Sequence, residues 1–342
     1  MFKGMKECFL YKRLANKKVQ CQTCSHYCAI SPNKRGICGV RENIDGRLYA
    51  LNYKKVAAIN IDPIEKKPFF HFLPGTYSLS IATVGCNFKC WNCQNFDISQ
   101  MPQTSGRIIG EEIAPEQIVK IAQRNKIPSV SYTYTEPTIF LEYAMEVMKI
   151  AKKNKIKNAW ISNGFMSKET INLISPYLDA ANIDLKSFDD KFYIKYAGGR
   201  LDPVLETLKR LREKNIWVEV TTLVIPSFND SDDILSKIAS FIKNKLGDNV
   251  PWHISRFSGT VSWKFKDIPD TPLATLEKAY QIGKSFGLKY VYIGNAPNLK
   301  KENTFCPKCG ALVIERDGYS VKRFDKNGKC PKCGALLDII VK

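Results

Sequence analysis

The chain has 342 residues, of which 44% are hydrophobic and 25% are charged, so it can bury a large core as a soluble protein of two or three domains. No stretch approaches the ~18–20 uninterrupted apolar residues of a membrane span, and charges interrupt the first twenty positions, which argues against a secretory signal. The net charge of +19 permits a nucleic-acid or acidic partner, although the basic residues are spread out, as in IAKKNKIKN, and fit a lysine-rich surface as well. We expect a cytoplasmic protein.

Residues 1–75 are predicted to form an N-terminal metal-binding region. The segment RENIDGRLYAL indicates a hairpin that turns at Asp45-Gly46. In a reducing cytoplasm, clustered cysteines bind metals more often than they form disulfides. This region holds a complete set of four, which we call the N-terminal quartet: Cys21, Cys24, Cys28 and Cys38. Zinc and iron–sulfur clusters both take four thiolates, so the spacing alone does not decide; zinc is the expected occupant, and an auxiliary iron–sulfur cluster is the alternative. Cys8 stands alone and is expected to be a packed thiol.

Residues 76–300 are expected to form a (β/α) barrel, partial or full. Short β-branched or aromatic runs alternate here with longer amphipathic segments, the pattern of repeated βα units. The expected strands are 78–84, 129–134, 158–162, 180–185, 217–225, 252–257 and 290–294. The expected helices are 114–125, 137–155, 166–177, 203–214, 231–245 and 273–287. In such a barrel the functional residues lie where strands end and loops begin.

Residues 301–342 carry two CPKCG knuckles with the spacing of a zinc ribbon. We call their four cysteines the C-terminal quartet: Cys306, Cys309, Cys330 and Cys333. A segment of this size cannot bury enough core to fold unaided, so a bound metal is expected to supply folding energy. Zinc is the expected occupant, and iron with an electron-delivery role is the alternative.

A third group of cysteines directly follows the first expected strand, in GCNFKCWNCQN. Cys86, Cys90 and Cys93 can hold three irons of a four-iron cubane and leave the fourth iron open for a substrate. The alternative is a zinc site that a distant side chain completes, but the other grouped cysteines already form full quartets and the chain has three histidines.

The spacing Cys-x3-Cys-x2-Cys at this place resembles the signature of the radical S-adenosylmethionine (SAM) superfamily. The resemblance implies a [4Fe-4S] cluster that cleaves S-adenosylmethionine reductively to a 5′-deoxyadenosyl radical, which abstracts hydrogen from a substrate. GCNFKCWNCQN resembles the branch of the pyruvate formate-lyase activating enzymes. Together with CQTCSHYC, DPIEKKPFFHFLPG, YTYTEPTIF, PWHISRF and YVYIGN, it looks more closely like the radical enzyme of the AmmeMemoRadiSam group, over about residues 15–305.

Further cofactor contacts follow from the same resemblance. Asn92 occupies the position that is usually aromatic and contacts adenine, so Trp91 or Phe88 would have to substitute. Glu136 stands where related enzymes receive the cofactor's amino group, although a plain helix start at Glu-Pro is the alternative. Ser162 and Asn163 stand where ribose hydroxyls bind, unless they form only a turn.

The run NIDLK places Asn182, Asp184 and Lys186 on one face of a strand, where three polar side chains need partners. The resemblance gives Lys186 the carboxylate of S-adenosylmethionine and Asp184 a supporting or cation-binding role; a structural Asp–Lys pair is the alternative. Arg256 is a further candidate contact. His253 lies on the opposite face of the same strand and fits an ordinary core histidine.

Three functions remain open from the sequence. The first is an activase-like radical SAM enzyme with a ferredoxin or flavodoxin as electron donor, acting on a protein glycine or a small molecule, with Memo-type and AMMECR-type proteins as partners that the resemblance suggests. The second is a radical SAM enzyme that modifies RNA, which the net charge and the C-terminal quartet motivate. The third is a metal-binding interaction protein without catalysis.

Overall fold

A single mixed sheet forms the centre of the protein, which we describe from a computed structural model covering residues 5–296 and 299–341. The strand order is β16-β15-β14-β13-β12-β11-β9-β8, and every neighbouring pair is parallel except β9 with β8. The parallel strands are β9 (Tyr77–Ala82), β11 (Ser129–Tyr132), β12 (Lys157–Ser162), β13 (Ala180–Asp184), β14 (Trp217–Val224), β15 (Trp252–Arg256) and β16 (Val291–Gly294). All seven expected strands are present, and the protein is an α/β fold with a mostly parallel sheet.

The edge strand β8 (Ala58–Pro63) was not expected from the sequence. It runs antiparallel to β9 along its whole length, from Ala58 opposite Ala82 to Pro63 opposite Tyr77. Its exposed and half-buried residues lack the apolar run that marks the parallel strands, because an edge strand has one neighbour only. Among the described residues, β8 and β16 are the two edges of the sheet, so hydrogen bonding does not close it into a full barrel.

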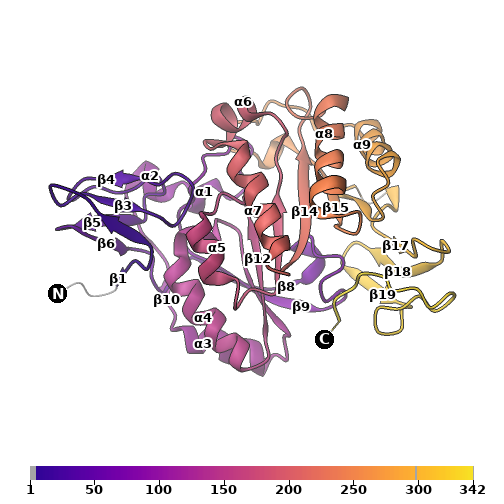
Figure 1. The fold of residues 1–342 in the computed structure, drawn as a ribbon, viewed down its shortest axis with the longest axis horizontal. Coiled ribbons are helices and arrows are strands. Elements are labelled where there is room, and N and C mark those ends of the chain that lie inside the picture. Colours follow the sequence, from indigo (N-terminus) through magenta and orange to yellow (C-terminus); the bar gives the residue numbers. More distant parts are fainter. Residues whose placement is uncertain (1–4, 297–298, 342) are drawn as a thin grey trace.

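Helices connect the parallel strands and cover the sheet (Figure 1). The sequence predicted the connecting helices, and local capping explains several of their starts. Ser167 and Ser231 accept hydrogen bonds from Thr170 N and Ile234 N at the first turns of α5 and α8. The main helices are α3 (Pro115–Arg124), α4 (Leu141–Lys153), α5 (Lys168–Ile174), α7 (Leu201–Glu213), α8 (Asp232–Phe241) and α9 (Leu273–Ser285). Short helical segments are η1 (Ile64–Lys66), α1 (Phe96–Ser99), α2 (Met101–Ser105), η2 (Pro137–Phe140), α6 (Asp190–Phe192), η3 (Tyr193–Ala197), η4 (Ile242–Leu246) and η5 (Gly259–Val261).

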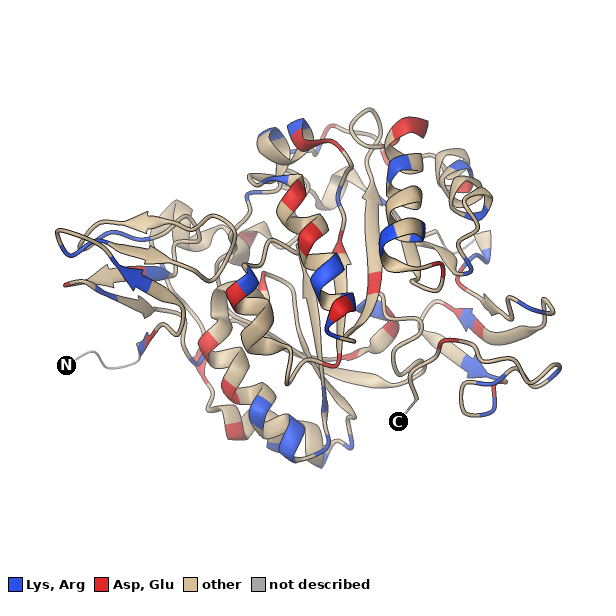
Figure 2. Cartoon of the chain, in the orientation of Figure 1, with Lys and Arg blue, Asp and Glu red and all other residues tan. Residues whose placement is uncertain are grey.

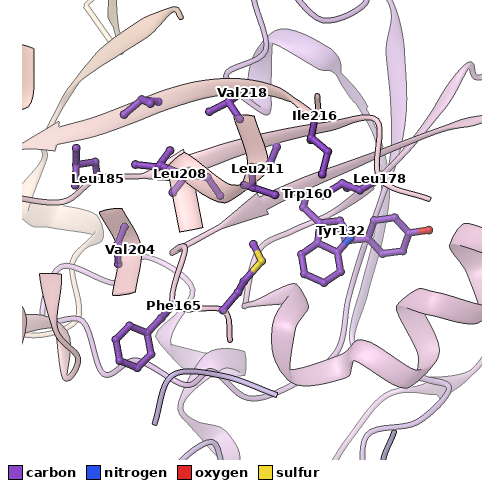
Figure 3. Close-up of a cluster of buried hydrophobic side chains, with 14 of the residues drawn as sticks. Tyr132, Trp160, Phe165, Leu178, Leu185, Val204, Leu208, Leu211, Ile216 and Val218 are labelled. Carbon is purple, nitrogen blue, oxygen red and sulfur yellow. The ribbon is translucent and has the colours of Figure 1, made fainter. Parts of the chain in front are cut away.

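The core lies between the sheet and these helices. Figure 3 shows Leu208 and Leu211 of α7 beside Val218 of β14, with Trp160 and Tyr132 on neighbouring strands, and all five are fully buried. Burial of apolar surface stabilises the fold by about 25 cal/mol per Å², so these side chains hold the strands and helices in position.

The N-terminal region consists of short antiparallel strands at one end of the molecule (Figure 1). The expected hairpin is confirmed: β5 and β6 pair across Asp45 and Gly46, whose φ angles of 51° and 81° suit a tight two-residue turn. The strands of the region are β1 (Lys6–Glu7), β2 (Tyr11–Arg13), β3 (Val19–Cys21), β4 (Ala29–Ile30), β5 (Arg41–Ile44), β6 (Arg47–Ala50) and β7 (Lys55–Val56), with β7 paired to β10 (Glu111–Glu112).

The C-terminal segment is a small three-stranded sheet at the opposite end of the molecule (Figure 1). Its strands are β17 (Thr304–Phe305), β18 (Leu312–Asp317) and β19 (Ser320–Arg323). The buried Arg316 joins it to the segment between η1 and β9 by donating to the carbonyl of Phe70 at 2.7 Å. The four thiols of the C-terminal quartet lie within 4.8 Å of one another, as one metal ion requires.

Two further features bear on partners. Figure 2 shows basic and acidic residues interspersed along the outer helices, such as α7. Within residues 5–296 and 299–341, no helix is both long and apolar enough to span a bilayer.

Candidate active site

The three-cysteine loop begins where β9 ends. Gly85 has a φ of +102°, and a Cβ there would lie 2.7 Å from Val40 Cγ1, so this turn requires glycine. Beyond it, the amide of Phe88 donates to Cys86 Sγ at 3.4 Å, and Cys93 Sγ lies 3.3 Å from Ser99 Oγ. The nine other cysteines are Cys8 and the two quartets, so within the described chain no fourth cysteine belongs to this group.

Two distant segments hold the loop in place, and the sequence predicted neither contact. The end of η3 accepts two of its amides, from Lys89 to Ala197 O at 2.8 Å and from Trp91 to Tyr196 O at 2.9 Å. On the other side, Trp263 donates to Cys93 O at 3.1 Å. These backbone contacts join the loop to η3 and to the segment around Trp263.

Glu136 connects the ends of two neighbouring strands beside this loop. Its carboxylate is fully buried and accepts hydrogen bonds from Thr138 N, Thr138 Oγ1, Ser162 Oγ and Asn163 N at 2.6–3.1 Å. Asn163 in turn donates to Asn87 Oδ1 at 2.8 Å, next to Cys86. The structure therefore brings three predicted contacts together at the cysteine loop. Glu136 also caps η2, so the helix-start alternative holds alongside any role toward a cofactor.

Asp184 and Lys186 form the second polar cluster at the loop. Their side chains pair at 2.8 Å, and the amide of Lys186 donates a hydrogen bond to Tyr193 Oη at 3.0 Å. Burial alone would lower the pKa of Lys186, but the charge of Asp184 and its hydrogen bond act against burial, and the net effect raises that pKa. Lys186 is therefore a permanent cation beside the thiols, suited to an anionic group. Asn182, farther down the strand, is fully buried and bonded to Pro68 O and Thr221 Oγ1.

The remaining candidates lie farther from the thiols or are occupied elsewhere. Asn92 is half-buried on the loop, between Trp91 and Cys93. Phe88 is fully buried, with its ring against Phe165, and so belongs to the core. Arg256 donates to Thr271 O at 2.9 Å at the end of β15, and no contact with the loop is found for it among the described residues.

His253 is an ordinary core residue. It is buried and lies 2.7 Å from Glu219, whose carboxylate also accepts the amides of Phe70, His71 and Phe72. This network lies near the start of β14, away from the strand ends that carry the cysteines.

The three thiols fit an iron–sulfur cluster chemically. Burial raises the pKa of Cys86 well above its ordinary value and that of Cys90 to about 12, so both are protonated when free and release protons on binding metal. Three soft sulfur donors on one loop suit iron, and the neighbouring lysine ammonium offsets part of the negative charge that such a thiolate-bound cluster carries.

Comparison with known proteins identifies the family. Residues 80–238 match the model of the radical SAM superfamily, and this span covers the cysteine loop and the strand ends around it. The chain belongs to the radical SAM superfamily. The family implies a [4Fe-4S] cluster and S-adenosylmethionine, with Cys86, Cys90 and Cys93 as the residues that fit the cluster.

The proteins similar to this radical SAM protein differ in sequence identity and in how much of each chain is covered. A protein of Methanocaldococcus jannaschii with no characterized function is 46% identical over 93% of both chains. The pyruvate formate-lyase 1-activating enzyme of Escherichia coli K12 is 25% identical over 47% of this chain and 66% of its own. The crystal structure of Streptococcus suis SuiB shares the fold, with a TM-score of 0.50 at 16% identity, over 66% of this chain and 48% of that one.

Proposed function

We propose that this radical SAM protein is activase-like and belongs to the AmmeMemoRadiSam group. It abstracts hydrogen from a substrate held at the carboxyl ends of the parallel strands, next to the three-cysteine loop. When bound, the cluster supplies the electron that cleaves S-adenosylmethionine to methionine and a 5′-deoxyadenosyl radical. The observation that carries the proposal is the juxtaposition of three thiols, a buried lysine cation and the Glu136 cluster at neighbouring strand ends.

In this proposal, different residues bind the cluster, bind S-adenosylmethionine and position the strand ends. Cys86, Cys90 and Cys93 hold the cluster. Lys186 provides the positive charge for the carboxylate of S-adenosylmethionine, with Asp184 holding its ammonium in place at 2.8 Å. Glu136, through Ser162 and Asn163, sets the geometry of the two strand ends that face the cofactor.

The activase assignment draws on the 25% identity with the Escherichia coli pyruvate formate-lyase 1-activating enzyme. That relative's name says that it activates another enzyme. A sheet that hydrogen bonding does not close is compatible with a peptide segment or with a smaller substrate, so the size class of the substrate has to be measured.

The first test is cofactor cleavage. The chain is reconstituted anaerobically with iron and sulfide, reduced with dithionite and incubated with S-adenosylmethionine, and 5′-deoxyadenosine is measured. We expect product from the wild type and none from Cys90→Ala. Lys89→Ala, at an exposed side chain on the same loop, is the matched control for iron content. A wild-type chain with a verified cluster and no product would refute the enzyme assignment.

The second test separates the activase from a small-molecule enzyme. Extract of the source organism is split by filtration into a protein fraction and a small-molecule fraction, and each is added to the reaction. The proposal expects the protein fraction to gain a glycyl-radical signal in electron paramagnetic resonance. A rise in 5′-deoxyadenosine with the small-molecule fraction alone would refute the activase role and leave the cofactor chemistry intact.

A further inference from the structure

The N-terminal quartet surrounds one cavity beside the active-site loop. Cys21 ends β3, and the other three cysteines follow on the turns before β5. None of them forms a disulfide. The cavity is lined by all four cysteines together with His26, Arg41 and other residues. Four unpaired thiols around one cavity form a metal site whose occupant the spacing of the sequence left open.

The distances between thiols distinguish zinc from a larger cluster. A tetrahedral zinc ion keeps its four sulfurs about 3.8 Å apart, because each Zn–S bond is about 2.3 Å long. The C-terminal quartet shows this spacing, with 3.7 Å between Cys306 and Cys333 and 3.6 Å between Cys309 and Cys330. Over the described parts of the chain, it is the only group in which three or more metal-ligating atoms lie within 4.8 Å of one another. The N-terminal quartet is therefore wider than a zinc site.

A cubane cluster needs that wider spacing, because its thiolates bind four separate irons around a core of iron and sulfide. The chain contains its own reference: the thiols of Cys86, Cys90 and Cys93, for which the family implies a four-iron cluster, also exceed the 4.8 Å limit. We propose that the N-terminal quartet binds a second [4Fe-4S] cluster. Four cysteines ligate all of its irons, so this cluster has no open position for S-adenosylmethionine.

Arg41 supplies independent support. It lines the cavity, is 2% exposed, and its Nε has no hydrogen-bond partner in the described structure. The rest of the guanidinium is bonded to Glu142, at 2.7 and 3.1 Å, and to Cys8 Sγ at 2.8 Å. An unsatisfied buried donor costs about 1–3 kcal/mol, and a sulfur acceptor on a bound cluster would remove that cost. Zinc-bound thiolates accept N–H donors as well, so Arg41 supports a metal–thiolate site, and the spacing of the thiols decides between zinc and a cluster.

The cavity also adjoins the active-site loop directly. His26 Nε2 lies 2.8 Å from the carbonyl of Asn87, the residue after Cys86. A Cβ on Gly85, the residue before Cys86, would lie 3.1 Å from the carbonyl of Cys38. The loop thereby engages Nε2 of His26, and the four thiols form a complete ligand set without it. The second cluster would contact the same loop that carries the first.

Metal analysis of the full chain without its first cluster tests this proposal. The triple variant Cys86→Ala, Cys90→Ala, Cys93→Ala is purified and reconstituted anaerobically. We expect it to retain about four irons and four sulfides per chain, with the Mössbauer spectrum of a cubane, and about one zinc at the C-terminal quartet. About two zinc ions and no iron, or no metal beyond the C-terminal one, would overturn the proposal.

The reciprocal variant locates the irons. Cys24→Ala with Cys28→Ala should lose about four irons and keep the cluster of the active-site loop. Cys8→Ser is the matched control, because Cys8 is a buried neighbour that does not line the cavity, and it should keep the iron of the wild type. Iron that stays in the double variant at the wild-type level would overturn the assignment. Neither measurement depends on cofactor cleavage, so the result is independent of the proposed activity.

Discussion

Replacing Glu136 by glutamine tests whether its buried carboxylate organises the strand ends around the cysteine loop. The carboxylate accepts four hydrogen bonds, three on Oε1 and the one from Asn163 N on Oε2 at 2.8 Å. Glutamine can present its oxygen on one side only, so its amino group faces a donor on the other side. If the oxygen takes the Oε1 side, the buried N–H of Asn163 loses its acceptor.

The expected cost follows from these contacts. An orphaned buried N–H costs about 1–3 kcal/mol, and the remaining bonds weaken as a charged acceptor becomes neutral. Burial raises the pKa of Glu136, which means that the carboxylate pays a desolvation cost that glutamine avoids. We therefore expect a net loss of about 2 kcal/mol in the free energy of unfolding, or a thermal midpoint lower by about 3 °C.

Circular dichroism of the cluster-loaded chain under anaerobic conditions measures this shift. All variants must be scanned at one rate, because cluster loss makes unfolding irreversible. Glu213→Gln, at an exposed glutamate on α7, is the control and should leave the midpoint unchanged. A shift of less than about 1 °C for Glu136→Gln would refute the organising role, since it would place the measured cost below that of one orphaned donor.

Three further predictions concern the cofactor, acid stability and the C-terminal metal. Lys186→Met should weaken binding of S-adenosylmethionine by about 10- to 100-fold in calorimetry, since a hydrogen bond to a charged group contributes about 1.5–3 kcal/mol, while Lys195→Met at an exposed side chain should not. Burial would raise the pKa of Glu219, but the hydrogen bond from His253 acts together with other contacts, among them the amide of Phe70, and the net effect lowers that pKa to about 2. The carboxylate therefore stabilises the fold fully above its ordinary pKa of 4.5, and this contribution, about 3 kcal/mol, is lost as the pH falls toward 2; the thermal midpoint of Glu219→Gln should vary less over this range. Cys309→Ser should remove one metal ion per chain in elemental analysis and leave the iron content unchanged, and a loss of iron instead would contradict the separate C-terminal site.

The parallel sheet could be predicted because the residue pattern of each strand is visible in a short stretch of sequence. Runs such as AANIDL are buried on both faces and bounded by turns, so burial pattern and length suffice to find them. The three-cysteine loop followed for the same reason, since it comes directly after such a run. His253 was correctly weighed as a core residue, because a histidine in an aromatic strand usually finds a buried partner.

The contacts that complete the site depend on segments far apart in the chain, and for this reason the sequence could not give them. The amides of Lys89 and Trp91 bond to the end of η3, more than a hundred residues later, and nothing in YIKYA indicates that its carbonyls face a cysteine loop. The link from Glu136 to Asn163 likewise appears only when two strand ends become neighbours. The width of the N-terminal quartet is also a tertiary property, because spacing along the chain does not fix the distance between thiols.

The C-terminal quartet stands at the end of the sheet where the strands begin. The hydroxyl of Tyr290 donates to the carbonyl of Leu337 at 2.9 Å, and Nδ1 of His71 lies 3.1 Å from the carbonyl of Asp338. Both carbonyls belong to the C-terminal segment that carries the quartet. The three-cysteine loop, in contrast, follows the opposite end of the strands. An eight-residue strand such as β14 is about 25 Å long, so a metal at this position is remote from the cofactor. A metal bound there would hold the C-terminal segment against the end of the sheet where the strands begin, far from the three-cysteine loop.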